Sequence, residues 1–176
     1  SHGLSRRDFT KACLALTAML GLKTSMLPTV VQAAETKKLP VVVWLHGHEC
    51  TGCDEALLRS SAPHTSDLVL NMIALEYHHT LASSAGHPFE DHLDQVIEEY
   101  KGQYILCIEG AIPLAEDGIF CMVGGHTFED HLKKCVEGAA AVMEIGSCAT
   151  WGGIQAAAPN PTGSTTTSAV ISGVPV

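Results

Sequence analysis

Two cysteines three positions apart follow a short apolar run in this sequence. Cys50 and Cys53 come shortly after Val41–Leu45, and Cys148 stands in a second glycine-containing stretch, Gly146–Gly153. Thiolates at such positions can form a redox dithiol, bind a metal ion or ligate an iron-sulfur cluster. Cys50, Cys53 and Cys148 are therefore the candidate cofactor-binding and metal-binding residues of the chain.

The spacing of Cys50 and Cys53 leaves several chemistries open. Gly52 lets the turn between them close tightly and bring both thiols to one side. Zinc accepts thiolates, but zinc sites usually pair two short-spaced motifs, and Cys148 has no nearby partner. A four-iron cluster needs four thiolates. A dithiol between a strand and a helix also fits a thioredoxin-like site, because a helix N-terminus lowers a thiol pKa.

The other four cysteines are not expected to bind the same group. Seven cysteines at uneven spacing are too few for a disulfide scaffold in 176 residues. Cys13 lies in the N-terminal segment, whereas Cys107 and Cys135 stand among apolar residues and are predicted core residues. Cys121 is predicted to pack in the same way.

The histidines near these motifs are expected to have supporting roles only. His46 and His48 precede the cysteine pair and are predicted to be exposed or to cap the loop. The adjacent residues His78 and His79 show no spacing typical of a metal site.

The elements that must position these residues alternate between strand and helix patterns. The predicted strands are Val41–Leu45, Val69–Tyr77, Tyr104–Ile108 and Ala141–Ile145, and the predicted helices are Asp54–Ser60, Phe89–Tyr100 and Phe128–Glu137. This alternation predicts an α/β fold with a mostly parallel sheet and helices on both faces. Ligands bind at the carboxyl ends of such strands, so His46–Cys53, Glu109–Pro113 and Gly146–Gly153 are predicted to converge on one site.

Residues 1–34 differ from the rest and predict a cleavable export signal. Arg6 and Arg7 lead into an apolar stretch of about 11 residues, Ala12–Leu22, and the small residues Ala33 and Ala34 follow. The stretch is too short to span a bilayer, which takes roughly 20 apolar residues. The adjacent arginines resemble the twin-arginine signal, which is known for exporting folded proteins, so residues 35–176 are predicted to be a periplasmic domain. The alternative is a retained amphipathic helix lying on a membrane.

The charge of the chain restricts its partners. The net charge is −9, and loss of residues 1–34 would remove four basic residues and only one acidic residue. Such an acidic protein is not expected to bind nucleic acid or anionic membranes, and it favours basic patches on a partner protein. Solubility alone would explain the charge equally well.

An ordered set of motifs resembles the small subunit of nickel-iron and nickel-iron-selenium hydrogenases. The motifs are VVVWLHGHECTGC at 41–53, LEYH at 75–78, IEGAIP at 108–113, GSCATWGGIQAA at 146–157 and NPTG at 160–163. The resemblance runs from Arg6 to Gly163. It implies a flavodoxin-like iron-sulfur domain over residues 35–176 that holds the proximal four-iron four-sulfur (4Fe-4S) cluster.

The resemblance also implies a role for each site residue. Cys50, Cys53 and Cys148 match three cluster ligands, whereas the family's fourth ligand belongs to a later Gly-Cys-Pro stretch that residues 1–176 do not contain. The cysteines and histidine that hold the family's further iron-sulfur clusters are also absent, so those clusters are expected only in a missing C-terminal part. The sequence stops as a new apolar segment begins, which favours a fragment. Glu49 and Glu109 match acidic positions near the cluster and the large-subunit interface. They are expected either to transfer protons or to be hydrogen-bonded structural carboxylates.

The implied function is that of the electron-transfer small subunit of a periplasmic nickel-iron hydrogenase, which oxidises dihydrogen reversibly. The nickel-iron site would lie in a separate large subunit, and a periplasmic cytochrome is a candidate electron partner. One alternative is an exported thiol-disulfide oxidoreductase that uses Cys50 and Cys53. Another is a quinone oxidoreductase subunit of similar fold, although such subunits tend to carry adjacent cysteines here. A third is a cluster-free module that only docks on the large subunit.

Overall fold

The computed structural model describes residues 6–19, 23–28, 31 and 39–176, and it divides into two units at residue 40. In the first unit, helix α1 (Arg6–Met19) begins at the twin arginines, and a short 3-10 helix, η1, covers Thr24–Met26. The predicted signal exit at Ala33 and Ala34 lies outside the described residues. No helix in the described part of the chain has the length and apolar character that crossing a membrane requires.

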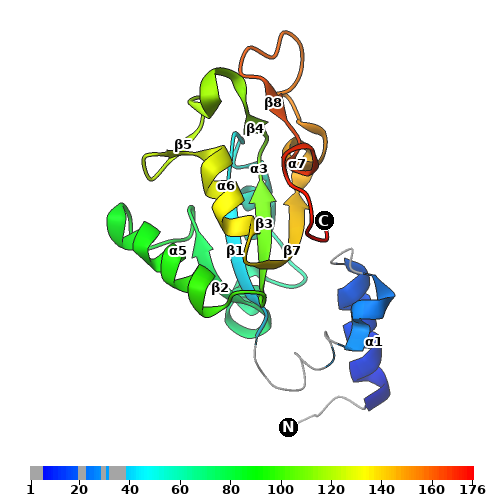
Figure 1. Ribbon diagram of the computed structural model, residues 1–176. Coiled ribbons are helices and arrows are strands. Elements are labelled where there is room, and N and C mark those ends of the chain that lie inside the picture. Colours follow the sequence, from blue (N-terminus) through cyan, green and yellow to red (C-terminus); the bar gives the residue numbers. More distant parts are fainter. Residues whose placement is uncertain (1–5, 20–22, 29–30, 32–38) are drawn as a thin grey trace. The chain divides into compact units, whose positions relative to one another are not determined.

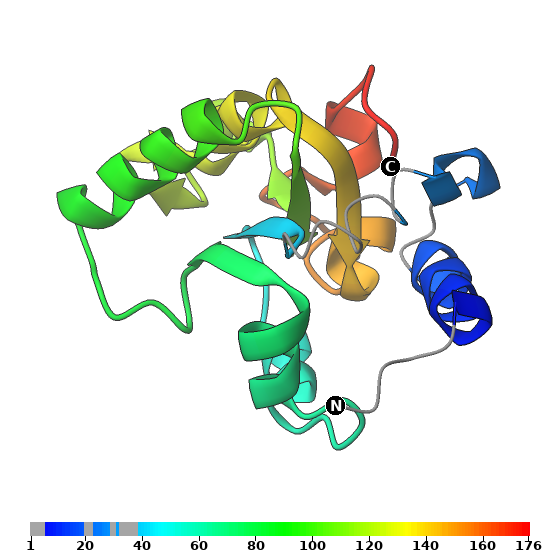
Figure 2. The ribbon, with the colours of Figure 1, turned by 90° about the horizontal axis from the view of Figure 1, so that it is seen from below.

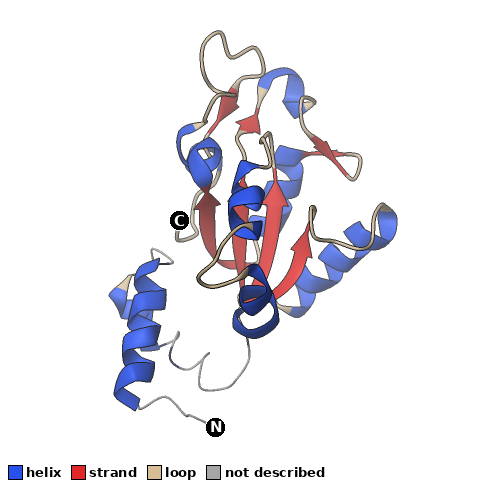
Figure 3. Ribbon diagram, turned by 180° about the vertical axis from the view of Figure 1, so that it is seen from behind, coloured by secondary structure: helices blue, strands red, loops and turns tan. Residues whose placement is uncertain are grey.

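The second unit is built on a four-stranded sheet (Figure 1; Figure 3). Its strands are β1 (Val41–His46), β2 (Ala74–His78), β3 (Tyr104–Glu109) and β7 (Ala139–Ile145). The order across the sheet is β2-β1-β3-β7, and every neighbouring pair is parallel. The predicted α/β class and the parallel sheet are therefore confirmed.

Helices cover both faces of this sheet, as the view in Figure 2 shows. Alternate residues of a strand point to opposite faces. Val41, Val43 and Leu45 of β1 pack in the core with helices α5 (His87–Glu99) and α6 (Phe128–Val136). Val42 and Trp44 form a second cluster with Leu57 of helix α3 (Gly52–Leu58). We call these two faces the α5/α6 face and the α3 face.

Short elements connect the layers. They are α4 (Thr65–Asp67), the π-helix η2 (Leu68–Met72), β4 (Ile112–Pro113), η3 (Ala115–Gly118), β5 (Met122–Val123), β6 (His126–Thr127), α7 (Gly146–Trp151), β8 (Ser164–Thr165) and α8 (Thr167–Val170). β4 pairs antiparallel with β8, and β5 pairs antiparallel with β6. The first of these pairs holds the loop after β3 against the chain segment that follows α7.

Three predicted elements need correction. The strand predicted over Val69–Tyr77 begins only at Ala74, because Leu68–Met72 is a helical turn whose Leu70 is 73% exposed. A short apolar run does not by itself distinguish a strand from a helix. The helix predicted at Asp54 starts at Gly52 and ends at Leu58. The stretch Gly146–Trp151, expected to be a loop, is helix α7.

The two cysteines assigned to the core are buried as predicted. Cys107 of β3 is 4% exposed on the α3 face, and Cys135 of α6 is fully buried on the α5/α6 face. Burial raises the pKa of each thiol to about 12. Cys121 is half-buried and packs against the α5/α6 core, as expected. These thiols are small apolar groups of the interior.

Candidate functional site

The three loops predicted to converge do meet at the carboxyl end of the sheet. The Gly47 backbone N–H donates to the Glu109 carbonyl oxygen at 2.7 Å, and His48 and Ala111 exchange two backbone hydrogen bonds of 2.9 Å. The Cys53 backbone N–H donates to Glu109 Oε1 at 3.2 Å. Loop 46–53 is thereby fixed to the end of β3.

The three candidate thiols lie near one another. Cys50 is exposed ahead of α3, Cys53 is half-buried in its first turn, and Cys148 is half-buried in α7. Burial, the Glu109 carboxylate and the neighbouring Cys148 and Cys50 sulfurs raise the pKa of Cys53 to about 11. The structure thus brings together two sequence stretches that are almost 100 residues apart.

Glycines leave space around two of these sulfurs. A Cβ on Gly146 would lie 2.3 Å from Cys53 Sγ, and a Cβ on Gly153 would lie 2.6 Å from Cys148 Sγ. Both glycines also have positive φ angles, at 75° and 57°, which disfavour other residues. Any side chain at these positions would displace a thiol.

The turn between Cys50 and Cys53 differs from the prediction in one respect. The residue in the left-handed conformation is Thr51, at φ 63°, and not Gly52. A Cβ on Gly52 would lie 3.1 Å from Cys50 Sγ. Gly52 therefore contributes room beside a sulfur, and the direction of the turn comes from Thr51.

The spacing of the thiols suits a multi-iron cluster better than one metal ion. In the described part of the chain, the only three His, Cys, Asp or Glu side chains with ligand atoms within 4.8 Å of one another are His46, Asp54 and His78. The three sulfurs are thus too far apart to surround one zinc ion. The ligands of a 4Fe-4S cluster bind different irons, so three converging thiols with glycines beside them fit that group.

The two candidate acidic residues have different surroundings. Glu109 is 1% exposed, and its Oε2 accepts a hydrogen bond from Trp44 Nε1 at 3.3 Å. Burial and the nearby Asp54 charge raise the pKa of Glu109 to about 7. Glu49 Oε1 accepts a hydrogen bond from the Thr51 hydroxyl at 3.3 Å, whereas its buried Oε2 has no partner. Glu109 is thus a hydrogen-bonded carboxylate beside Cys53, with a pKa that also permits proton exchange.

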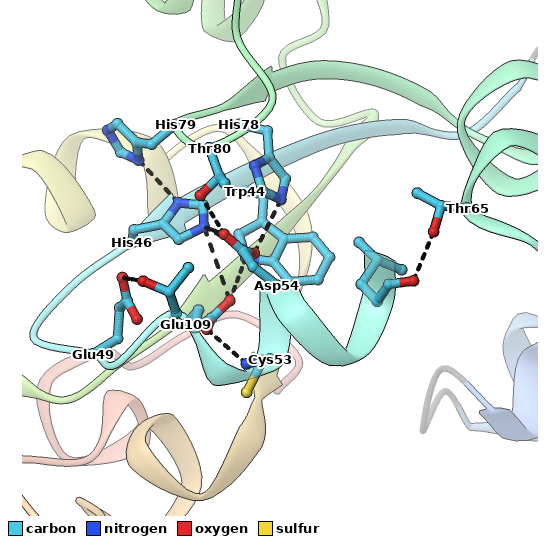
Figure 4. A network of polar contacts seen from close by, with 12 residues as sticks. Trp44, His46, Glu49, Cys53, Asp54, Thr65, His78, His79, Thr80 and Glu109 are labelled. Carbon is cyan, nitrogen blue, oxygen red and sulfur yellow. Dashed lines mark hydrogen bonds and ion pairs between the residues drawn. The ribbon is translucent and has the colours of Figure 1, made fainter. Parts of the chain in front are cut away.

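The prediction that His46 is exposed or caps a loop is wrong. His46 is the last residue of β1 and is 8% exposed, because the strand runs one residue beyond Leu45. Its Nε2 lies 3.1 and 3.2 Å from the Asp54 carboxylate oxygens, and its Nδ1 lies 3.0 Å from His79 Nδ1 (Figure 4). His48 lies in the loop after β1, and its Nδ1 is 3.2 Å from Ser164 Oγ of β8.

The sequence reasoning therefore missed a polar cluster at the carboxyl end of β1, most of it buried on the α3 face (Figure 4). Its members are Trp44, His46, Asp54, His78, His79, Thr80 and Glu109. One member could have been found from the strand pattern. Residues two apart in a strand share a face, so His46 is expected on the same face as Trp44. It was missed because the cluster draws on β1, α3, β2 and β3.

The fold and the three thiols together define an α/β domain with a sulfur site at the carboxyl edge of its parallel sheet. The chain belongs to the family described as NADH ubiquinone oxidoreductase, 20 Kd subunit, whose model matches residues 50–176. The Hydrogenase-2 small chain of Escherichia coli K12 is 46% identical over 173 residues, which cover 98% of this chain and 46% of that protein. The uptake hydrogenase small subunit of Cupriavidus necator is 47% identical over 175 residues, 99% of this chain and 49% of that protein.

Solved structures agree with these relatives. A reduced, active nickel-iron-selenium hydrogenase from Desulfomicrobium baculatum matches with a TM-score of 0.76 and 32% identity, covering 79% of this chain and 55% of that one. The recombinant enzyme from Desulfovibrio vulgaris Hildenborough matches with a TM-score of 0.74 and 38% identity, covering 79% and 53%. The resemblance to hydrogenase small subunits and the flavodoxin-like fold are confirmed. The chain spans about half the length of the curated relatives it matches.

Proposed function

We propose that this chain is the electron-transfer part of a hydrogenase small subunit and that it holds the proximal 4Fe-4S cluster. The observation that carries the proposal is the convergence of Cys50, Cys53 and Cys148 at one end of the sheet, with Gly146 and Gly153 leaving space beside two of the sulfurs. When bound, the cluster would supply a site that accepts and passes on single electrons. The fourth ligand would come from outside these three cysteines.

The residues of this chain would position and tune that group. Glu109 holds the first turn of α3 by accepting the Cys53 N–H, and Trp44 Nε1 in turn donates to the other Glu109 oxygen. Hydrogen bonds and charges around the sulfurs set the reduction potential of an iron-sulfur cluster. Glu109 is therefore proposed to set both the position of Cys53 and the local charge.

The proposed partner is a large subunit that carries the nickel-iron site and catalyses reversible dihydrogen oxidation. Trp151 and Ile154, which closely follow Cys148, are 83% and 82% exposed. Large apolar side chains exposed this close to a functional site are typical of a protein interface. The names of the relatives support this assignment, because they are small subunits of hydrogenases.

We also propose that the protein is exported to the periplasm by the twin-arginine route and passes electrons to a periplasmic cytochrome. Arg6 and Arg7 at the start of α1 support the export route. Export of a folded protein suits a cofactor that is inserted in the cytoplasm. Fractionation of cells that express the full-length protein, with Arg6→Lys and Arg7→Lys together as the variant, tests the route. Retention of the variant in the cytoplasm supports it, and unchanged export contradicts it.

The alternative function, a thiol-disulfide oxidoreductase using Cys50 and Cys53, is less well supported. A reactive thiol needs a lowered pKa so that the thiolate is populated. Burial and the Glu109 charge instead raise the pKa of Cys53 to about 11. Cys148 would also have no role in a two-thiol mechanism.

Iron and acid-labile sulfide content tests the proposal. The full-length protein should contain both, and Cys148→Ser should lose about four iron atoms per chain. Cys121→Ser is the matched control, because Cys121 is also half-buried but packs against the core. Iron loss in the control as well, or in neither variant, would contradict the assigned ligands.

A further inference from the structure

A second group of ligand atoms lies on the α3 face, apart from the three cysteines. His46, Asp54 and His78 are 8%, 1% and 3% exposed, and their donor atoms all lie within 4.8 Å of one another. Asp54 is on α3, His46 ends β1 and His78 ends β2. The set is therefore held by three elements of the folded core.

His78 is the unpartnered member of this set. Neither of its ring nitrogens makes a hydrogen bond, although His78 Nε2 lies only 3.3 Å from Asp54 Oδ1. Buried polar groups are normally satisfied, and an exception requires an explanation such as an ion. A neutral imidazole nitrogen is the commonest metal ligand, so an ion in this set would give His78 a partner.

The directions of the hydrogen bonds that lead from Tyr77 through His79 to His46 also point to a cation beside His46. The Tyr77 hydroxyl donates to Glu90 Oε1 at 3.0 Å, so its contact with His79 Nε2 at 3.1 Å requires that nitrogen to be the donor. In a neutral ring, His79 Nδ1 then accepts, and the N–H in its 3.0 Å contact must come from His46 Nδ1.

A proton on His46 Nδ1 determines what the other ring nitrogen, His46 Nε2, can do. If the His46 ring is neutral, this nitrogen carries a lone pair directed at the Asp54 carboxylate, 3.1 Å away. Two acceptors at this distance need a positive charge between them. A proton on His46 Nε2 would serve that one contact and leave His78 unpartnered, whereas a metal ion would serve His46, Asp54 and His78 together.

The distances suit a small tetrahedral ion. With zinc bonds of about 2.0–2.1 Å, neighbouring ligand atoms in a tetrahedron are about 3.3 Å apart. His46 Nε2 to Asp54 Oδ1 is 3.2 Å, and His78 Nε2 to the same oxygen is 3.3 Å. Glu109 Oε2, at 3.9 Å from His46 Nε2, is the next carboxylate outward.

Outer contacts would orient these ligands. The Thr80 hydroxyl donates to Asp54 Oδ2, and the His46 Nδ1–H would donate to His79. Histidine ligands of metal sites usually donate their second N–H to a fixed acceptor in this way. Asp54 and His46 therefore already have outer partners, whereas His78 Nδ1 has none.

We propose that His46, Asp54 and His78 bind a divalent transition-metal ion, with zinc as the chemically best match. The ion would be structural, joining α3 to β1 and β2 beneath the loop that carries Cys50 and Cys53. The proposal does not depend on a cluster being bound at the cysteines, since it shares no ligand with them.

The test is zinc analysis of the full-length protein, purified from its natural host with its associated subunits and dialysed. The wild type should carry about one zinc more per small subunit than His78→Gln, whose zinc content at this site should fall about tenfold or more. His92→Gln is the matched control: its ring is 44% exposed, bonds the Glu76 carbonyl oxygen and should leave the zinc content unchanged. Iron content measured on the same samples reports whether each variant has folded.

Zinc K-edge X-ray absorption of the wild type makes the test independent of variant folding. The expected first shell contains only nitrogen and oxygen at about 2.0–2.1 Å. Absence of zinc after supplementation, retention of zinc in His78→Gln, or a sulfur shell at about 2.3 Å would each overturn the proposal. Zinc absence with normal iron content would reject the histidine site alone and leave the proposed cluster untouched.

Discussion

The Cys53 backbone N–H and the Glu109 carboxylate are joined by a 3.2 Å hydrogen bond that links the start of α3 to the end of β3. Two residues 56 positions apart are thus in direct contact at the carboxyl edge of the sheet. Glu109 lies beside the candidate cluster ligand and has a pKa raised, by burial and the Asp54 charge, to about 7. Its charge therefore lies next to a proposed ligand of the cluster.

Removing that charge should make the proposed cluster easier to reduce. At pH 8, where Glu109 is ionised, Glu109→Gln should raise the cluster's reduction potential by an amount on the order of tens of millivolts. Potentiometric titration followed by electron paramagnetic resonance measures the shift. Glu98→Gln, at an exposed position on α5, is the charge-matched control and should give no shift. An equal shift in both variants would rule out a local effect of Glu109.

Gly146→Ala should prevent iron binding by displacing a sulfur. The added Cβ would lie 2.3 Å from Cys53 Sγ at a φ of 75°. Gly173→Ala is the matched control, because its φ is 84° but nothing lies within 4 Å of the new Cβ. Both changes carry a backbone cost of about 1–2 kcal/mol, and only the first should lower the iron content. Normal iron in Gly146→Ala would show that this glycine does not shape the site.

The α5/α6 core should account for much of the stability of the domain. Leu132 of α6 is fully buried, so Leu132→Ala should lower the free energy of unfolding by about 2–5 kcal/mol. Leu70→Ala, at a position 73% exposed, should change it by about 0.5 kcal/mol or less. Chemical denaturation followed by circular dichroism gives both values. Similar losses of unfolding free energy in the two variants would contradict the role given to the α5/α6 core.

Acid should weaken the fold partly through His131. This residue is 4% exposed, and burial lowers its pKa below the ordinary 6.5 despite the nearby Glu90 charge. The folded state therefore binds fewer protons here than the unfolded state, so this contribution to stability is complete above pH 6.5 and is lost as the pH falls below it.

The measurement for His131 is the urea midpoint at pH 7.5 and pH 5.5. The urea midpoint of His131→Phe should fall less between pH 7.5 and pH 5.5 than that of the wild type, because a phenyl ring does not titrate. His64→Phe, at an exposed position just before α4, should behave as the wild type. If the urea midpoint of His131→Phe falls as much as that of the wild type, the acid sensitivity belongs to other groups.

Sequence patterns predicted the central fold and the sulfur site for clear physical reasons. Val41–Leu45 is buried on both faces, so its apolar run identified a central strand, and β1 extends it by a single residue. The cysteine stretches follow β1 and β7, and parallel strands bring their carboxyl ends to one edge. The convergence of Cys50, Cys53 and Cys148 could therefore be predicted without coordinates.

The histidine cluster could not be predicted in the same way. Its donors have no regular spacing, because His46, Asp54 and His78 meet only through the packing of α3 against β1 and β2. The start of β2 was also misplaced, since Val69–Met72 has the apolar content of a strand but lies on the surface as a helical turn. Only the register of β2 with β1 places His78 beside Trp44.

The central claim is that Cys50, Cys53 and Cys148 hold a four-iron cluster. Low-temperature electron paramagnetic resonance of the reduced full-length protein tests it most directly, alongside mass spectrometry of its alkylated cysteines. The account predicts a reduced-cluster signal that is lost in Cys148→Ser, with no disulfide between Cys50 and Cys53. Absence of any cluster signal, together with reversible formation of a Cys50–Cys53 disulfide, would contradict the account and favour the thiol oxidoreductase.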